Sequence, residues 1–278
     1  MTHTTEGGSR AGRRHLRPFG FAVLLLPLTL ALAPVSVRAQ EEECDEGHHH
    51  HIHFSHPIFT ESVSPDDKVR LDWAGTFAED EDEHEIEFEG EYTFADWFSI
   101  EVAAPYAFVS ETGEETENAF GNLEVALKFA NYAFEDRGVL LGYGVEFGLP
   151  TGDPDKGIGD DHIVEIEPFF NIGIKTGDLE LVGWTRFGIP TNQDEGEEVE
   201  TEFHYDAAAL YHFNRRLQGL LELNGDVGLS GEEAGEGTVS LGPGVKFAPF
   251  FDNAFMVGIG ASFPLDDSEV DAALRVSL

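Results

Sequence analysis

The fold class is decided by the stretch EIEFEGEYTF, residues 85–94, in which a glutamate occupies every second position up to residue 91. Successive side chains of a β-strand point to opposite faces, so a period of two sorts them into two sets. One face would carry Ile86, Phe88, Gly90, Tyr92 and Phe94, and the other Glu85, Glu87, Glu89, Glu91 and Thr93. A helix would instead spread the glutamates around its circumference. The pattern predicts a strand with one apolar and one wet face.

The same alternation recurs along the rest of the chain. We expect twelve strands, near residues 67–76, 84–94, 97–109, 119–134, 138–149, 162–175, 179–190, 201–213, 216–229, 237–249, 254–264 and 269–278. Lengths of about ten residues suit a tilted strand that crosses a bilayer better than the strands of soluble sheets, which typically have about five or six.

The connections between these strands alternate in length. Long ones are expected at 78–83, 110–118, 150–161, 191–200 and 230–236, a moderate one at 265–268, and short ones at 95–96, 135–137, 176–178, 214–215 and 251–253. Outer-membrane barrels have tight periplasmic turns, longer outer loops and an even strand number, whereas the connections of a soluble sandwich need not sort by length. Residues 66–278 are therefore predicted to form an all-β, transmembrane, antiparallel up-and-down β-barrel with both ends in the periplasm.

Residues 1–39 have the features of a cleaved signal peptide. Four arginines precede an apolar run at 19–33, and small residues precede a cleavage point after Ala39. A membrane anchor is the weaker interpretation, because the run is short and Pro27 and Pro34 interrupt it or follow it closely. The predicted location is the cell outer membrane, with its lipid as a partner.

The chain that follows the leader is strongly acidic. Removing the five arginines and one glutamate of residues 1–39 leaves 11 basic and 53 acidic residues. This balance argues against a nucleic-acid partner, whose phosphates would be repelled. Because Cys44 is the only cysteine, an intramolecular disulfide is excluded.

Residues 40–65 are predicted to be a flexible, acidic and histidine-rich periplasmic segment at the barrel mouth. Imidazole and thiolate are preferred ligands of Zn²⁺, Ni²⁺ and Cu²⁺, so one of these ions is a candidate cofactor here. The candidate ligands are Cys44, His48, His49, His50, His51, His53 and His56. A solvated spacer is the alternative, and contact with a periplasmic partner is a further prediction.

The wet faces of the strands would line the lumen. The candidate lining residues are Glu87, Glu89, Glu101, Glu124, Lys128, Glu165, Glu167, His204, Asp206, His212, Glu222 and Arg275. Acidic residues predominate, which favours cations in an open lumen. Pairing across the lumen could instead close it. We expect no enzymatic activity, since no serine lies in a nucleophile motif and His204 and His212 are eight residues apart on one strand.

Two motifs resemble those of a known family. The strand FGNLEVALKF at 120–129 and the loop GLPTGD at 148–153, followed by KGIG at 156–159, are similar to the outer-membrane "transporter" family labelled "putative MetA-pathway of phenol degradation". The resemblance covers roughly residues 70–278. It implies a channel-like transporter for small molecules, with aromatic or apolar compounds as solutes. The acidic lumen adds metal cations as a second solute class. The alternative is a metal-binding or structural outer-membrane protein without an open pore.

Overall fold

The computed structural model describes residues 51–78, 81–113, 115–191, 200–231, 234–250, 255–266 and 270–278. The leader and the residues Cys44, His48, His49 and His50 lie outside this part of the chain. The strands are β1 (Lys68–Ala78), β2 (Glu81–Ala95), β3 (Phe98–Glu111), β4 (Glu117–Phe120), β5 (Leu123–Asn131), β6 (Val139–Leu149), β7 (Val164–Thr176), β8 (Leu179–Thr191), β9 (Glu202–Asn214), β10 (Leu217–Gly228), β11 (Gly237–Phe247), β12 (Val257–Pro264) and β13 (Val270–Ser277).

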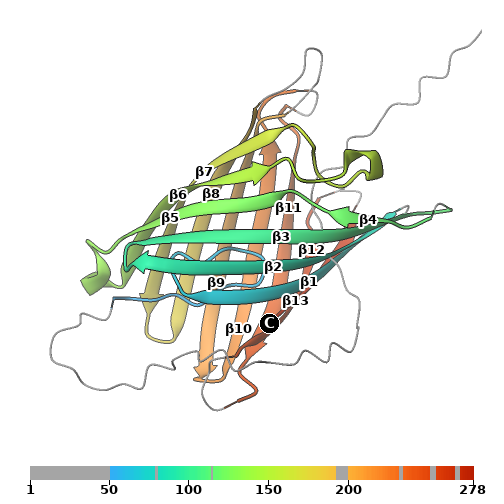
Figure 1. Cartoon of the computed structure of the whole chain (residues 1–278). Coiled ribbons are helices and arrows are strands. Elements are labelled where there is room, and N and C mark those ends of the chain that lie inside the picture. The colour runs from blue at the N-terminus through green and yellow to red at the C-terminus, as the bar shows by residue number, and fades with distance from the viewer. Residues whose placement is uncertain are drawn as a thin grey trace, which may run out of the picture.

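These strands form one closed antiparallel barrel (Figure 1). Each pairs with its neighbours in chain order, and β1 pairs with β13 to complete the ring. The short β4 and the following β5 both pair with β3, so together they make one of twelve spanning strands. The break between them falls where the Gly121 amide donates to the carbonyl of Pro105 at 3.0 Å. The predicted twelve-stranded antiparallel barrel is confirmed.

The barrel has charged side chains inside and apolar side chains outside. On β2, Glu89 and Glu91 are buried, whereas Phe88, which precedes them, and Tyr92, which follows them, are 55% and 61% exposed. On β9 the outward-facing Tyr211 is likewise exposed, whereas the neighbouring Leu210 is one of the apolar residues that face the interior. Exposed aromatic and aliphatic side chains over the outer surface are unfavourable in water and suit a lipid environment.

Two predicted connections differ from the structure. The expected long connection at 78–83 is wrong, because the hairpin ladder continues to the pairs Thr76 with Glu83 and Phe77 with Asp82. The expected short turn at 251–253 is also wrong, since β11 ends at Phe247 and β12 begins only at Val257. Directly after β11 the chain is held by Arg216, whose guanidinium donates to the carbonyls of Ala248 and Pro249 at 3.0 Å each.

Helical structure in the described part includes two single turns, Glu135–Arg137 and Pro154–Lys156. No helix among the described residues is long and apolar enough to cross a membrane.

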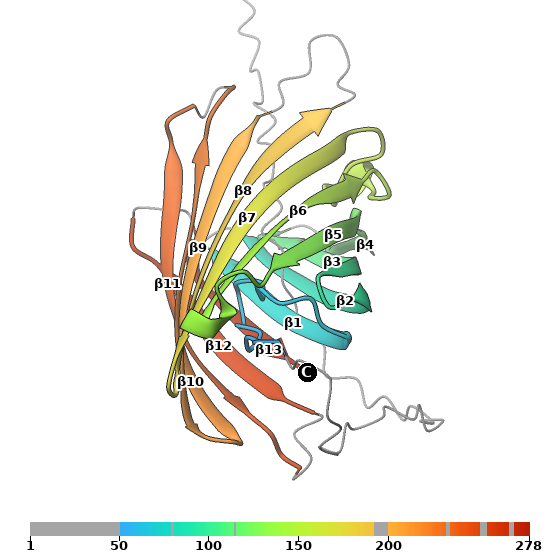
Figure 2. The same ribbon diagram turned by 90° about the vertical axis from the view of Figure 1, so that its left-hand side faces the viewer.

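Residues 51–67, which we call the plug, run without regular secondary structure into the barrel. In Figures 1 and 2 this blue coil lies within the ring of strands. Phe54, Ile58 and Val63 are buried against interior side chains, the larger of which are Leu140, Leu210 and Leu220. Gly173 leaves room for Phe54, whose ring would lie 2.6 Å from a Cβ at that position.

The plug corrects the expectation of a flexible segment over 40–65. Residues 51–65 are packed inside the barrel, because the apolar side chains among the histidines find an apolar region of the interior. Residues 40–50 lie outside the described part of the chain.

The exposed outer face predicts a depth-dependent response to charge. Phe170, 49% exposed, lies at the middle of β7, whereas Phe213, 62% exposed, lies near the end of β9. We expect Phe170→Arg to lower the free energy of unfolding from lipid vesicles by about 2–4 kcal/mol, and Phe213→Arg by about 0–1 kcal/mol. Urea titration of the vesicle-inserted protein measures both. Equal losses would contradict a bilayer around the barrel.

Candidate functional site

The plug is held by a carboxylate clamp. Glu222 of β10 is fully buried and accepts hydrogen bonds from three consecutive backbone amides, those of Ile58, Phe59 and Thr60. The donor–acceptor distances are 2.9, 3.0 and 2.7 Å. Successive amides that converge on one anion form a nest, and charge-assisted bonds of this kind are stronger than neutral ones. Glu222 therefore fixes the path of the chain across the interior.

A cluster of alternating charges packs beside the clamp. Lys128 of β5 lies 3.2 Å from Glu91 and 3.1 Å from Glu101, and Lys68 of β1 lies 2.5 Å from Glu89. Glu61 of the plug reaches both lysines, with an oxygen 3.4 Å from each ammonium. Buried carboxylates need such partners, because an unpaired charge is very costly in a protein interior. The cluster joins β1, β2, β3, β5 and the plug.

Arginines continue this network around the barrel. Asp72 receives Arg70 at 2.7 Å and Arg275 at 2.5 Å, and Arg275 also lies 3.2 Å from Glu87. Arg70 in addition donates to the carbonyl of Ile58 at 2.8 Å. The seam between β1 and β13, where the barrel closes, is therefore crossed by ion pairs that also contact the plug.

A second set of contacts holds the beginning of the plug. Glu180 of β8 is fully buried and lies 2.7 Å from the Lys175 ammonium and 3.0 Å from His212. It accepts the backbone amide of Ser55 at 2.8 Å, and Lys175 donates to the carbonyl of His53 at 3.1 Å.

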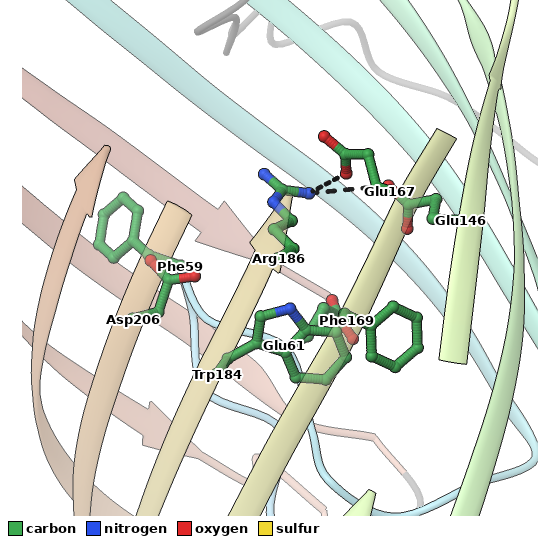
Figure 3. A pocket seen from close by; sticks show the side chains of 8 residues that line it. All are labelled: Phe59, Glu61, Glu146, Glu167, Phe169, Trp184, Arg186 and Asp206. Atoms are coloured by element: carbon green, nitrogen blue, oxygen red, sulfur yellow. Dashed lines mark hydrogen bonds and ion pairs between the residues drawn. The ribbon is translucent and has the colours of Figure 1, made fainter. Parts of the chain in front are cut away.

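The interior contains a cavity beside the plug (Figure 3). It encloses about 370 Å³ of space, part of it open to solvent. Its lining comprises Phe59, Glu61, Glu146, Glu167, Phe169, Trp184, Arg186 and Asp206. The stacked rings of Phe169 and Trp184 have centroids 4.5 Å apart. Arg186 lies 2.9 Å from Glu167 and 3.6 Å from Glu146.

The predicted lumen residues fall into three groups. Those with side chains in ion pairs of the interior or at its ends are Glu87, Glu89, Glu101, Lys128, Glu167, His204, His212 and Arg275. Glu222 holds the plug and Asp206 lines the cavity. Glu124 and Glu165 are half-buried on the interior faces of β5 and β7.

Several interior residues were missed. Four of them follow the alternation of inward and outward side chains along β1 and β8, so the same reasoning could have identified them: Arg70, Asp72, Glu180 and Arg186. Glu61 could not be found in this way, because it belongs to the plug.

The histidines within the described part do not converge. His51 lies 2.8 Å from Glu135 and stacks on Tyr132, whereas His56 lies 3.4 Å from Asp66. Burial and the neighbouring Lys68 lower the pKa of His56 to about 4, so this imidazole is neutral at ordinary pH.

Among the described residues, three glutamates bring carboxylate oxygens close enough together to share a metal ion: Glu61, Glu89 and Glu101. Lys68 and Lys128 already neutralise that group. A metal at the histidine-rich segment stays a prediction.

A closed antiparallel barrel with a charged interior and an apolar exterior defines a transmembrane β-barrel of the outer-membrane type. Residues 61–276 match the family described as "Putative MetA-pathway of phenol degradation", and the chain belongs to this family.

Two solved structures share the fold. An outer-membrane channel from Pseudomonas putida F1 is similar with a TM-score of 0.58 at 12% identity, over 75% of this chain and 92% of that one. The NanC porin is similar with a TM-score of 0.55 at 7% identity, over 76% of this chain and 98% of that one. None of the curated proteins compared with the chain matches it.

The charge cluster predicts a strong dependence on Lys128. Replacing it with methionine leaves Glu91 and Glu101 without this ammonium, so we expect Lys128→Met to cost about 3–5 kcal/mol of unfolding free energy. Lys156→Met is the control, because that lysine pairs with Asp153 in a solvent-exposed loop and should have little effect. Urea titration in vesicles compares the two. A similar, small effect of both substitutions would show that the interior pairs are not required.

Proposed function

We propose that this protein is an outer-membrane channel for small solutes, and that its lumen favours cations over anions. The observation that carries the proposal is the inverted barrel, with exposed aromatic side chains outside and ionised groups inside. A polar interior within an apolar shell is the arrangement by which outer-membrane barrels let water and solutes cross lipid. Family membership and the similarity in fold to a channel and a porin support the same proposal.

The cation preference follows from the composition of the interior. Four of the residues around the cavity are carboxylic acids and one is a cationic arginine. A passage lined mainly by carboxylates attracts cations and repels anions. Aromatic or apolar compounds are a further solute class within the proposal, supported by the family description.

The proposed location is the outer membrane, after export and removal of residues 1–39. Lipid would surround the exposed aromatic side chains of the outer surface. One of the two similar structures is a channel and the other is a porin, which supports transport rather than catalysis. We assign no nucleophile or acid–base pair to this chain.

The plug favours a second candidate function. Residues 51–67 pack into the interior through Glu222, Glu180 and the charge cluster. A barrel closed in this way would serve as a scaffold, with the histidine-rich segment as a site for Zn²⁺, Ni²⁺ or Cu²⁺ or for a periplasmic partner. Conductance separates the two candidates.

The channel proposal predicts that the purified protein conducts ions across a planar lipid bilayer and that the plug limits the current. Glu222→Gln replaces one acceptor oxygen of the clamp with an amide group that faces backbone donors. Hydrogen bonds to charged groups contribute about 1.5–3 kcal/mol, so loss of one should raise the unplugged fraction about tenfold or more. Single-channel recording of full-length protein measures this fraction.

Glu85→Gln is the matched control, since it removes a carboxylate from the interior face of β2 and leaves the clamp intact. Larger or longer openings in Glu222→Gln alone support a plugged channel. Silent bilayers with both variants and with the unmodified chain would contradict the channel and favour the closed scaffold.

A further inference from the structure

The cavity is built by four neighbouring strands and closed by the plug. Paired positions bring its wall together: Glu146 of β6 is opposite Glu167 of β7, Phe169 is opposite Arg186 of β8, and Trp184 is opposite Asp206 of β9. Phe59 and Glu61 complete the lining from the plug.

The carboxylates around the cavity differ in how they are neutralised. Glu146 and Glu167 share Arg186, and Glu61 is paired with Lys68 and Lys128. Asp206 accepts a hydrogen bond from the neutral amide of Asn224 at 2.8 Å. Within the described part of the chain, Asp206 has no cation within ion-pair distance. The cavity therefore presents one carboxylate without a cation in direct contact, because Arg186, which acts on Asp206 from a longer distance, is paired with Glu146 and Glu167.

Aromatic faces lie beside this carboxylate. Phe169 and Trp184 are stacked and are only 7% and 6% exposed, so their positions are fixed by packing. Phe59 belongs to the same lining, and Figure 3 shows its ring at the left of the view, whereas the Trp184 and Phe169 rings are lower and farther to the right. Aromatic faces attract cations through their quadrupole and also contact apolar groups favourably.

These features together select one class of ligand. A metal ion needs several converging ligand atoms. Among the described residues, Glu61 is the cavity carboxylate that belongs to such a group, together with Glu89 and Glu101, and Lys68 and Lys128 already neutralise that group. An anion would meet an excess of negative charge. A neutral aromatic compound would leave Asp206 without a cation in direct contact. An ammonium ion with an aromatic or apolar body satisfies the carboxylate and the rings together.

We propose that the cavity is a binding site for organic ammonium ions, with Asp206 contacting the ammonium group and Trp184, Phe169 and Phe59 contacting the apolar body. This inference rests on the proposed channel function, because the lumen is the route by which such a solute reaches the cavity. It makes the solute preference a property of a defined site as well as of the total lumen charge.

The test measures binding of benzylammonium, benzyl alcohol and benzoate to the full-length protein in detergent by isothermal titration calorimetry. These probes share one aromatic body and differ in charge. We expect saturable binding of benzylammonium and at least about tenfold weaker binding of the other two. Asp206→Asn should weaken benzylammonium binding about tenfold or more and leave benzyl alcohol unaffected. Trp184→Leu should weaken benzylammonium binding while keeping the preference for charge.

Glu85→Gln is again the control, because it removes an interior carboxylate from the opposite side of the fold and should leave affinity unchanged. Equal losses of benzylammonium affinity in Asp206→Asn and Glu85→Gln would overturn the proposed site. They would show that the preference for cations depends on the total charge of the lumen. Equal affinity for benzyl alcohol, or Asp206-dependent binding of Ca²⁺ that displaces benzylammonium, would also overturn it. Conductance is read separately: a conducting protein without benzylammonium binding refutes this inference alone, and binding by a silent barrel refutes the channel alone.

Discussion

Charge pairing inside the barrel is the constraint on which the rest of the structure depends. The chain after the leader contains only eleven basic residues against fifty-three acidic ones, and the interior uses a large share of those eleven. Lys68, Arg70, Lys128, Arg186 and Arg275 all form ion pairs with acidic interior residues. Without these partners the carboxylates on the strands' inner faces would be buried as isolated charges, which is among the costliest arrangements in a protein.

The plug follows from the same constraint. Its Glu61 carboxylate pairs with the ammonium groups of Lys68 and Lys128. Three of its backbone amides donate hydrogen bonds to the Glu222 carboxylate, so the plug contacts interior charges of both signs. Its apolar side chains occupy a separate region, against Leu140 and Leu210. The interior is thus divided into a part filled by the plug and a cavity beside it. The cavity is therefore lined by residues of the plug as well as of the wall.

Alternation along single strands predicted the twelve spanning strands and which residues of β2 and β9 face inward, and the alternating lengths of the connections predicted the barrel. The reason is that a strand has a fixed period of two, and each spanning strand here separates lipid from lumen. The same period of two places three further residues on inner faces, and they could have been included among the predicted lining residues: Glu91, Arg70 and Arg186.

The plug could not be predicted in this way. Residues 51–67 have no regular period, and their histidines and acidic residues indicated a solvated segment. Whether Phe54 and Ile58 bury themselves depends on an apolar region formed by strands more than seventy residues away, which local patterns do not contain. The cavity has the same origin, because Glu146, Trp184 and Asp206 come together only through the register of neighbouring strands.

The most direct test of the acidic, water-accessible interior is the reversal potential of the full-length protein in a planar bilayer that separates two different concentrations of KCl. An excess of carboxylates along the passage predicts a reversal potential displaced toward the equilibrium potential of potassium. A reversal potential displaced toward that of chloride, or no displacement in a conducting protein, would contradict the account.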